Sequence, residues 1–386
     1  MADTERVPLS ELRDLIVVGE PLPFRVLEAG GRLLLNQGQM VDTERQFAQL
    51  VERGAWVERP RVEQVRLARS NAAAQMASTA QRKATLFDLW DDWTKGFGEL
   101  LRRTASQRAL PGEFETRADA LQVLIARDAD IALFLSIRQD SMKPALYPAL
   151  HAMHCAVACT LTTTQLAWPA AQVQSATRAA LSMNASMTEL QAVLAEQRDP
   201  PSQRQLDAIR AHPHAAADML RGLGVVDEVW LQAVEDHHEH ADGKGYPRGM
   251  TTTSQLAQLL RIIDVYMAKL SGRAARAALP PVLAARQLFQ QLGQTPLSSG
   301  LIRTLGAHPP GALVQLQSGE VAVVSRRAKG GPAPQVATLS NKQGKPVVET
   351  HHRDSALPEF AITGPVVDAK AFARTLPERV FGMIMA

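Results

Sequence analysis

The chain has 386 residues, with 42 basic and 39 acidic side chains and a formal net charge of +3 at pH 7. This length predicts two or three domains, and a composition of 46% hydrophobic and 21% charged residues is typical of a globular protein. No basic tract suits duplex nucleic acid, and no apolar run approaches the roughly 20 residues of a membrane span. The N-terminus also lacks the apolar segment of a signal peptide. We therefore expect a cytoplasmic protein with neither a membrane span nor a duplex nucleic-acid partner.

Residues 1–58 are predicted to form a small β-rich (α+β) domain. Short apolar runs separated by turn residues indicate strands; they lie at residues 15–18, 24–27 and 33–35. A helix from about Asp42 to Arg53 is expected to pack on these strands, with Gly54 as its stop. Residues 59–146 are predicted to combine a helical segment with a polar stretch at 60–84, which is either a solvated linker or an exposed helix.

Helical periodicity continues from Tyr147 to about Leu305. Two apolar runs at 313–316 and 321–324, separated by a polar turn, then predict a β-hairpin. A further run at 335–339 would extend that hairpin. We expect a mainly α fold, with a helical domain and terminal hairpin over 147–325 and a C-terminal extension over 326–386 that carries no recognisable motif.

The most informative stretch runs from His237 to Pro247 and reads H-H-E-H-A-D-G-K-G-Y-P. His237 and His238 continue the apolar stripe of the preceding predicted helix, and His154 shares a face with apolar residues of another. Asp264 lies on the apolar face of a third, where a buried carboxylate must be paired, ligated or protonated. A lone histidine on such a face is usually a core residue, but several beside a buried aspartate favour a metal or anion site.

The His237–Pro247 run resembles the signature of HD-GYP domains, which are bacterial metal-dependent phosphodiesterases of cyclic di-GMP. The resemblance covers roughly residues 147–325 and implies an HD-type helical bundle. It implies metal ligation by His154, His212, His237, His238 and Asp264, phosphate binding by Arg273 and Arg276, and a signature turn of Asp242, Gly243, Gly245, Tyr246 and Pro247. Planar guanidinium groups suit phosphate because they donate two parallel hydrogen bonds. In the turn, glycine supplies φ > 0, proline fixes the exit, and Asp242 is expected to cap through its side chain.

One part of the family's pattern is missing from this chain. Met183 and Asn184 stand where the family has its His-Asp pair, Met187 replaces a lysine, and Leu150 replaces a glutamate that some members use as a ligand. A bridging carboxylate holds two cations with its two oxygens, whereas asparagine offers one neutral carbonyl and methionine a soft thioether. The family's nucleophile is a metal-bridging hydroxide. We therefore expect the two-metal mechanism to be lost and assign no catalytic residue.

Three functions remain open from the sequence. The first is a degenerate HD-GYP protein of cyclic di-GMP signalling, a receptor or scaffold with little or no hydrolase activity that docks a diguanylate cyclase (GGDEF) domain through its signature turn. The second is a working phosphodiesterase with one metal ion held by His212, His237, His238 and Asp264. The third is a helical interaction module that binds neither nucleotide nor metal. Any ion would be one divalent Fe, Mn or Zn, bound weakly or not at all.

The remaining candidate ligands are predicted to have other roles. His151, His214, His240 and His308 match no ligand position of the family and are expected to be structural or solvated. The pair His351-His352, with Asp354, is predicted to lie in a surface loop. Cys155 and Cys159 lack a second pair for a zinc site and are expected to be buried free thiols of a reducing compartment.

Overall fold

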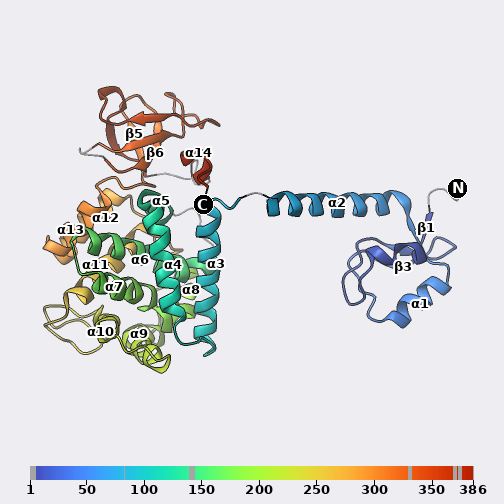
Figure 1. Ribbon diagram of the computed structural model, residues 1–386, viewed down its shortest axis with the longest axis horizontal. Coiled ribbons are helices and arrows are strands. Elements are labelled where there is room, and N and C mark those ends of the chain that lie inside the picture. The colour runs from blue at the N-terminus through green and yellow to red at the C-terminus, as the bar shows by residue number, and fades with distance from the viewer. Residues whose placement is uncertain are drawn as a thin grey trace. The chain divides into compact units, whose positions relative to one another are not determined.

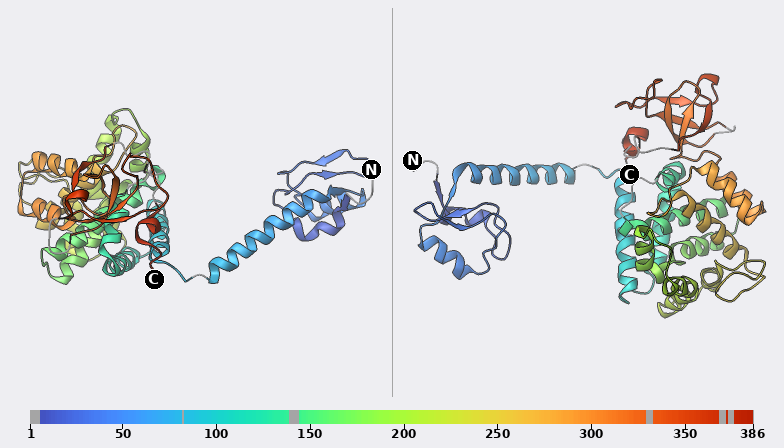
Figure 2. Two further views of the ribbon diagram at one scale, coloured as in Figure 1. Left: turned by 90° about the horizontal axis from the view of Figure 1, so that it is seen from above. Right: turned by 180° about the vertical axis from the view of Figure 1, so that it is seen from behind.

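The computed structural model describes residues 6–81, 83–138, 144–328, 333–367, 372 and 376–385, and for residues 71–81 and 144 it describes the backbone alone. The chain divides into two compact units, Met1–Lys83 and Ala84–Ala386 (Figures 1 and 2). The predicted fold class is confirmed, because the fold is mainly helical with small antiparallel sheets near both ends.

The first unit is built on a four-stranded antiparallel sheet. Its strands are β1 (Arg6–Pro8), β2 (Val26–Leu27), β3 (Leu33–Leu35) and β4 (Trp56–Glu58), in the order β1-β4-β2-β3. Helix α1 (Glu44–Glu52) begins where the Thr43 hydroxyl accepts a hydrogen bond from the Gln46 backbone N–H, and it ends before Gly54, whose φ is +66°. The predicted helix and its stop are thus confirmed.

The predicted strand at 15–18 is wrong. A 3-10 helix, η2 (Leu9–Leu15), occupies the approach to it, and Ile16 to Val18 pair with no strand. Leu9, Leu12 and Leu15 are all buried. The backbone at Leu12 is not helical, with φ −113° and ψ 19°, so η2 consists of two short 3-10 turns joined by a kink.

The polar stretch after residue 58 is helical. Helix α2 (Arg59–Gln81) begins directly after strand β4. Its sequence is rich in Ala, Gln and Arg, which have high helix propensity, so a continuous helix forms without an extensive apolar face. Of the two alternatives for this stretch, the helix is the one observed over residues 60–81.

Helices form most of the second unit. They are α3 (Leu86–Ala105), α4 (Glu113–Arg127), α5 (Ala129–Ile137), α6 (Tyr147–Gln165), α7 (Ala170–Ser182), α8 (Thr188–Glu196), α9 (Gln203–Gly222), α10 (Glu228–Asp236), α11 (Gln255–Leu270), α12 (Pro281–Leu292) and α13 (Pro296–Leu305), with 3-10 turns η3 (Pro144–Leu146) and η4 (Ala185–Met187). Helix α6 lies at the centre, in contact with α3, α5, α7, α11 and α13. Cys155 and Cys159 are fully buried in it as free thiols, as predicted.

The core of this unit begins earlier in the chain than residue 147. Trp90 and Phe97 of α3, Leu121 of α4 and Ile131 of α5 are buried in the same hydrophobic cluster as helix α6. Because α3, α4 and α5 bury apolar residues against α6 in one cluster, the residues predicted to precede the helical domain are an integral part of it.

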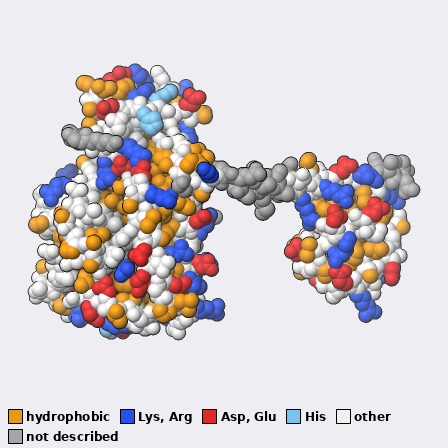
Figure 3. Space-filling model, in the orientation of Figure 1, with side chains coloured by type: hydrophobic (Ala, Val, Ile, Leu, Met, Phe, Trp, Pro, Cys, Tyr) orange, Lys and Arg blue, Asp and Glu red, His pale blue; other side chains and the backbone are white. Residues whose placement is uncertain are grey.

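A five-stranded antiparallel sheet follows the helices. Its strands are β5 (Leu313–Leu316), β6 (Val321–Arg326), β7 (Gln335–Thr338), β8 (His352–Asp354) and β9 (Ile362–Pro365), in the order β8-β7-β6-β5-β9. The predicted hairpin is present as β5–β6, with Leu313 opposite Val323. Because β7, β8 and β9 join the same sheet, no structural boundary falls at residue 325. His352 and Asp354 lie in an exposed edge strand rather than a loop, and histidine side chains are visible over this sheet in Figure 3.

Ion pairs and one glycine attach the sheet to helix α5. Arg326 donates to the Asp128 carboxylate at 2.6 Å, and Arg327 donates to Asp130 at 2.5 Å. Gly311 has φ +92°, and a Cβ there would lie 2.8 Å from the Phe134 carbonyl oxygen. Only glycine allows so close an approach of the sheet to the helix.

None of the helices in the described part of the chain combines the length and the hydropathy that crossing a bilayer requires. On the face drawn in Figure 3, acidic and basic side chains are interspersed, and no continuous basic tract is visible.

A C-terminal aromatic residue joins helices α3 and α5 to the sheet. Phe381, at the end of α14 (Pro377–Phe381), lies 5.0 Å from the Phe134 ring and 6.2 Å from the Phe87 ring, with the Arg326 guanidinium 4.9 Å above it. We predict that Phe381→Ala lowers the free energy of unfolding by about 2–4 kcal/mol in urea denaturation, because a largely buried aromatic contact is removed. Met383→Ala, at an exposed residue of the same segment, is the control and should change it by less than about 0.5 kcal/mol. Equal effects of the two variants would contradict this role.

Candidate metal and anion site

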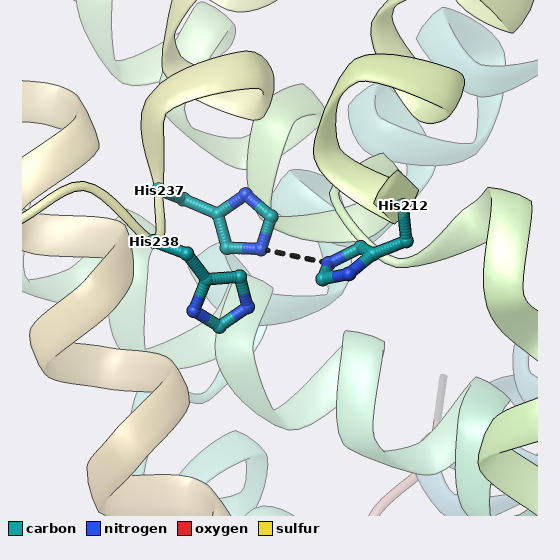
Figure 4. A group of neighbouring side chains, drawn as sticks. All are labelled: His212, His237 and His238. Atoms are coloured by element: carbon teal, nitrogen blue, oxygen red, sulfur yellow. Dashed lines mark hydrogen bonds between the residues drawn. The ribbon is translucent and has the colours of Figure 1, made fainter. Parts of the chain in front are cut away.

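Three histidines meet where helices α9 and α10 come together. His212 lies in α9, His237 caps the C-terminus of α10, and His238 follows it. The Nε2 atoms of His212 and His237 are 3.2 Å apart (Figure 4). The His238 ring centroid is 4.2 Å from that of His237 and 5.1 Å from that of His212. The three side chains place one nitrogen each within 4.8 Å of the others, so the structure brings together three of the five predicted metal ligands.

The backbone fixes which nitrogens of two of these rings face one another. Nδ1 of His212 lies 2.6 Å from the Ile209 carbonyl oxygen, and Nδ1 of His237 lies 2.6 Å from that of Val234. A carbonyl only accepts, so each Nδ1 carries the proton and donates. Burial, followed by the nearby His237, lowers the pKa of His212 to about 3, and burial also lowers the pKa of His237. Both rings are therefore neutral at pH 7, with two Nε2 lone pairs facing each other.

Two facing lone pairs repel unless a cation lies between them, and this arrangement fits a metal ion. Imidazole nitrogens bound to one zinc ion at about 2.0–2.1 Å lie about 3.3 Å apart in tetrahedral geometry, close to the 3.2 Å observed. Donation of the other ring nitrogen to a backbone carbonyl is also characteristic of metal-ligating histidine. His212, His237 and His238 thus fit one divalent cation.

The signature turn folds back onto these histidines. The Tyr246 ring stacks on His238 with centroids 4.6 Å apart. The Asp242 carboxylate accepts a hydrogen bond from the Lys244 backbone N–H at 3.0 Å, which confirms the predicted cap, and Gly243 has φ +71°. Gly245 differs from the expectation: its φ is not positive, but a Cβ there would lie 2.4 Å from the His240 backbone nitrogen. Close backbone approach explains that glycine.

Glu239 stabilises the same loop instead of serving as a ligand. It is 4% exposed. One carboxylate oxygen accepts from the Arg248 backbone N–H at 2.6 Å and the other from the Met250 N–H at 2.9 Å. Both oxygens of Glu239 hold the loop backbone, and Glu239 does not belong to the group formed by the three histidines.

Asp264 of α11 belongs to a second group. Its carboxylate accepts a hydrogen bond from His151 Nε2 at 2.8 Å, and Cys155 Sγ lies 3.6 Å from the same nitrogen. Burial alone would raise the pKa of Asp264, but the hydrogen bond from His151, together with electrostatic interactions with His151, His238 and His237, outweighs it and holds that pKa below its usual range. The expectation that this carboxylate must find a partner is met by His151, and the five predicted ligands do not form one cluster.

His154 stands apart from both groups. It is buried in α6, its Nδ1 has no hydrogen-bond partner among the described residues, and burial, followed by His151, lowers its pKa to about 3. His151 was expected to be structural or solvated because it matches no family ligand, yet it is buried and holds Asp264. Its spacing of three and four residues from His154 and Cys155 places all three on one helix face, which was the signal available in the sequence.

Met183 and Asn184 lie in the interior, at the end of α7 and the start of η4. They are 0% and 7% exposed, respectively. The Ser186 hydroxyl donates to the His212 carbonyl oxygen at 2.9 Å, so this segment lies directly beside helix α9. The position expected for a His-Asp pair therefore carries a thioether and a neutral amide, in a segment beside the helix that contributes His212.

The two predicted phosphate-binding arginines follow α11. Arg273 donates from Nε to the Tyr147 hydroxyl at 3.0 Å, and its guanidinium lies 4.7 Å from the Tyr147 ring centroid. Arg276 is exposed and donates to the Ala268 carbonyl oxygen. The Tyr147 ring stacks on His151 with centroids 5.5 Å apart and an angle of 9°. No motif of the sequence pointed to Tyr147.

The other histidines lie outside both groups. His214 is 2.9 Å from a Glu235 oxygen, His240 is 3.7 Å from an Asp242 oxygen, and His308 is half-buried. Their carboxylate neighbours or exposure agree with structural or solvated roles.

Residues 141–294 match the family model of the HD domain. Cyclic di-GMP phosphodiesterase PA4108 of Pseudomonas aeruginosa is 32% identical over 120 residues, which are 30% of this chain and 29% of that protein. The matched part thus spans less than a third of that relative. The solved structure of Bd1817, a HDG"Y"P protein from Bdellovibrio bacteriovorus, aligns with a TM-score of 0.47 and 15% identity, over 78% of this chain and 98% of that one. Residues 141–294 are thus similar to the HD domain family, and they contain the histidine motif that resembles the HD-GYP signature.

Proposed function

We propose that this protein is a cyclic di-GMP receptor that holds one divalent ion and hydrolyses the nucleotide slowly or not at all. The observation behind this proposal is that the predicted metal-binding histidines are present, whereas the family's His-Asp pair is missing. Three histidines converge within ligand distance of one another, whereas Met183 and Asn184 stand where the family's pattern has a His-Asp pair, and Asp264 accepts a hydrogen bond from His151. The relative from P. aeruginosa is named as a cyclic di-GMP phosphodiesterase, which supports the nucleotide as the ligand.

Different residues of the chain would bind different parts of the nucleotide. An ion on the three histidines would supply positive charge for a phosphate oxygen. Arg273 offers guanidinium donors for a second phosphate contact. Tyr246, stacked on His238, presents an aromatic ring beside the ion site. These groups bind and orient a phosphodiester without providing a nucleophile.

Hydrolysis is disfavoured because the chain lacks the carboxylate that would hold a second ion. Asn184 is neutral and Met183 is a soft ligand, so neither stabilises a second hard cation or the hydroxide between two ions. The competing reading, a phosphodiesterase with a single ion, needs Asp264 as a ligand. The 2.8 Å contact between Asp264 and His151 favours the receptor.

We also propose that the signature turn docks a partner, a GGDEF-domain protein, and that the protein acts in the cytoplasm. Asp242, Lys244 and Pro247 are exposed on the outer face of the turn. Free thiols such as Cys155 and Cys159 persist in a reducing compartment. Exchange of Lys244 for Glu should weaken binding of a GGDEF-domain protein in surface plasmon resonance by about 3-fold or more, and unchanged affinity would remove the turn from the contact.

Metal content tests the ion site. We predict that the protein, loaded with Fe, Mn or Zn and then desalted, retains up to one ion per chain, and that His237→Ala weakens metal affinity by at least about 10-fold, because one of three nitrogen ligands is lost. The measurement is elemental mass spectrometry with competitive chelation. His214→Ala removes a histidine outside the cluster and should retain the wild-type ion content. Equal metal content in wild type and His237→Ala would contradict the assignment.

Restoring the missing pair tests why hydrolysis is disfavoured. We predict that the double variant Met183→His, Asn184→Asp binds more metal than the wild type and hydrolyses cyclic di-GMP at least about 10-fold faster, because it regains a bridging carboxylate. Met183→Leu, Asn184→Gln is the control, since it changes the same buried positions without adding a ligand. Circular dichroism verifies that both variants fold. If the two double variants have the same turnover, the missing pair is not what limits the reaction.

A further inference from the structure

We infer that Tyr147 is a positioning residue that orients Arg273 for a phosphate group, an inference that rests on the proposed function. Tyr147 is the first residue of helix α6, and its side chain is 1% exposed. Its hydroxyl oxygen accepts from Nε of Arg273 at 3.0 Å and also from one terminal guanidinium nitrogen. The guanidinium carbon lies 4.7 Å from the ring centroid. One tyrosine therefore contacts Arg273 both through its hydroxyl and through its ring.

Tyr147 accepts hydrogen bonds along one edge of the guanidinium, and this determines which N–H donors stay available to a ligand. A guanidinium carries five N–H donors in one plane. Tyr147 takes the edge formed by Nε and one terminal nitrogen, and Nη1 of Arg273 has no partner among the described residues. The end edge, with its two terminal nitrogens, is left for the two parallel hydrogen bonds that a phosphate accepts.

The Tyr147 ring is also held in place by a second neighbour, His151. Its ring is stacked on His151 at an angle of 9°, one turn further along α6, and His151 Nε2 lies 2.8 Å from an Asp264 oxygen. Asp264 lies within α11, and Arg273 follows it in the chain, beyond the C-terminal end of the helix at Leu270. The two rings of α6 thus connect a cation and an anion of the neighbouring segment in one row of four side chains.

This row lowers the cost of binding an anion. A free arginine side chain loses rotamer freedom when a ligand immobilises it, and avoiding that loss is worth about 2- to 10-fold in affinity. Arg273 has already lost that freedom in the contact with Tyr147. The Arg276 side chain, by comparison, is exposed, and it donates to the Ala268 carbonyl oxygen without contacting an aromatic ring among the described residues. Arg273 is therefore the better prepared of the two arginines.

Tyr147→Phe isolates the role of the hydroxyl. The substitution keeps the ring, its stack on His151 and its contact with the guanidinium, and removes only the oxygen that accepts from Arg273. We expect the full-length, metal-loaded Tyr147→Phe protein to bind cyclic di-GMP about 2- to 10-fold more weakly than wild type in isothermal titration calorimetry. Tyr266→Phe, at a buried tyrosine of α11, is the control and should leave the affinity unchanged.

A double-mutant cycle separates positioning from a general structural effect. If Tyr147 acts through Arg273, Tyr147→Phe costs no further affinity in a protein that already carries Arg273→Ala. Additive losses in the double variant would overturn the inference. An unchanged affinity of the single Tyr147→Phe variant would also overturn it.

Inorganic pyrophosphate distinguishes failure of this inference from failure of the proposed function. If the wild type binds no cyclic di-GMP, the proposed receptor function is wrong, and the same cycle is then run with pyrophosphate. Non-additive effects of Tyr147→Phe and Arg273→Ala on pyrophosphate affinity would still support Tyr147 as the positioning residue. Absence of pyrophosphate binding to the wild type would overturn the inference as well.

Discussion

The 3.2 Å approach of two neutral imidazole nitrogens, Nε2 of His212 and Nε2 of His237, is the constraint on which the site depends. Each ring is held in place by a carbonyl oxygen of its own helix, so neither nitrogen can turn away without losing a buried hydrogen bond. The turn that follows brings Tyr246 against His238, and it closes only because Gly245 lacks a side chain. The backbone carbonyls of the two helices and the turn together hold the three histidine side chains in place.

A second group of side chains, outside the three histidines, is satisfied by contacts within the protein. Asp264, which could have faced a metal, is hydrogen-bonded to His151, and through Tyr147 the same row reaches Arg273. A charge that is paired within the protein is costly to release, because its partner would be left buried and alone. In our proposal the two groups therefore have different roles. The three histidines attract a phosphate group through a bound ion, and the group around Asp264 does not hold a second ion.

Local features of the fold could be predicted from the sequence, whereas long-range pairings could not. Helix α1, the β5–β6 hairpin and the grouping of His237 with His238 follow from periodicity, turn residues and adjacency along the chain. The contact of His151 with Asp264 joins residues 113 positions apart, and no spacing rule encodes it. The same reason hid the pairing of β9 with β5. At residues 15–18 the apolar run indicated a strand, but the chain forms short 3-10 turns up to Leu15 and no ladder after it.

The most direct test of the central claim is to incubate metal-loaded wild-type protein with an excess of cyclic di-GMP and to follow bound and free nucleotide by chromatography. The account predicts that the protein retains the cyclic nucleotide and that the nucleotide stays intact over many hours, far below the turnover of about 1–1,000 per second typical of enzymes. Rapid appearance of the linear dinucleotide or of GMP, in amounts exceeding the protein, would contradict it.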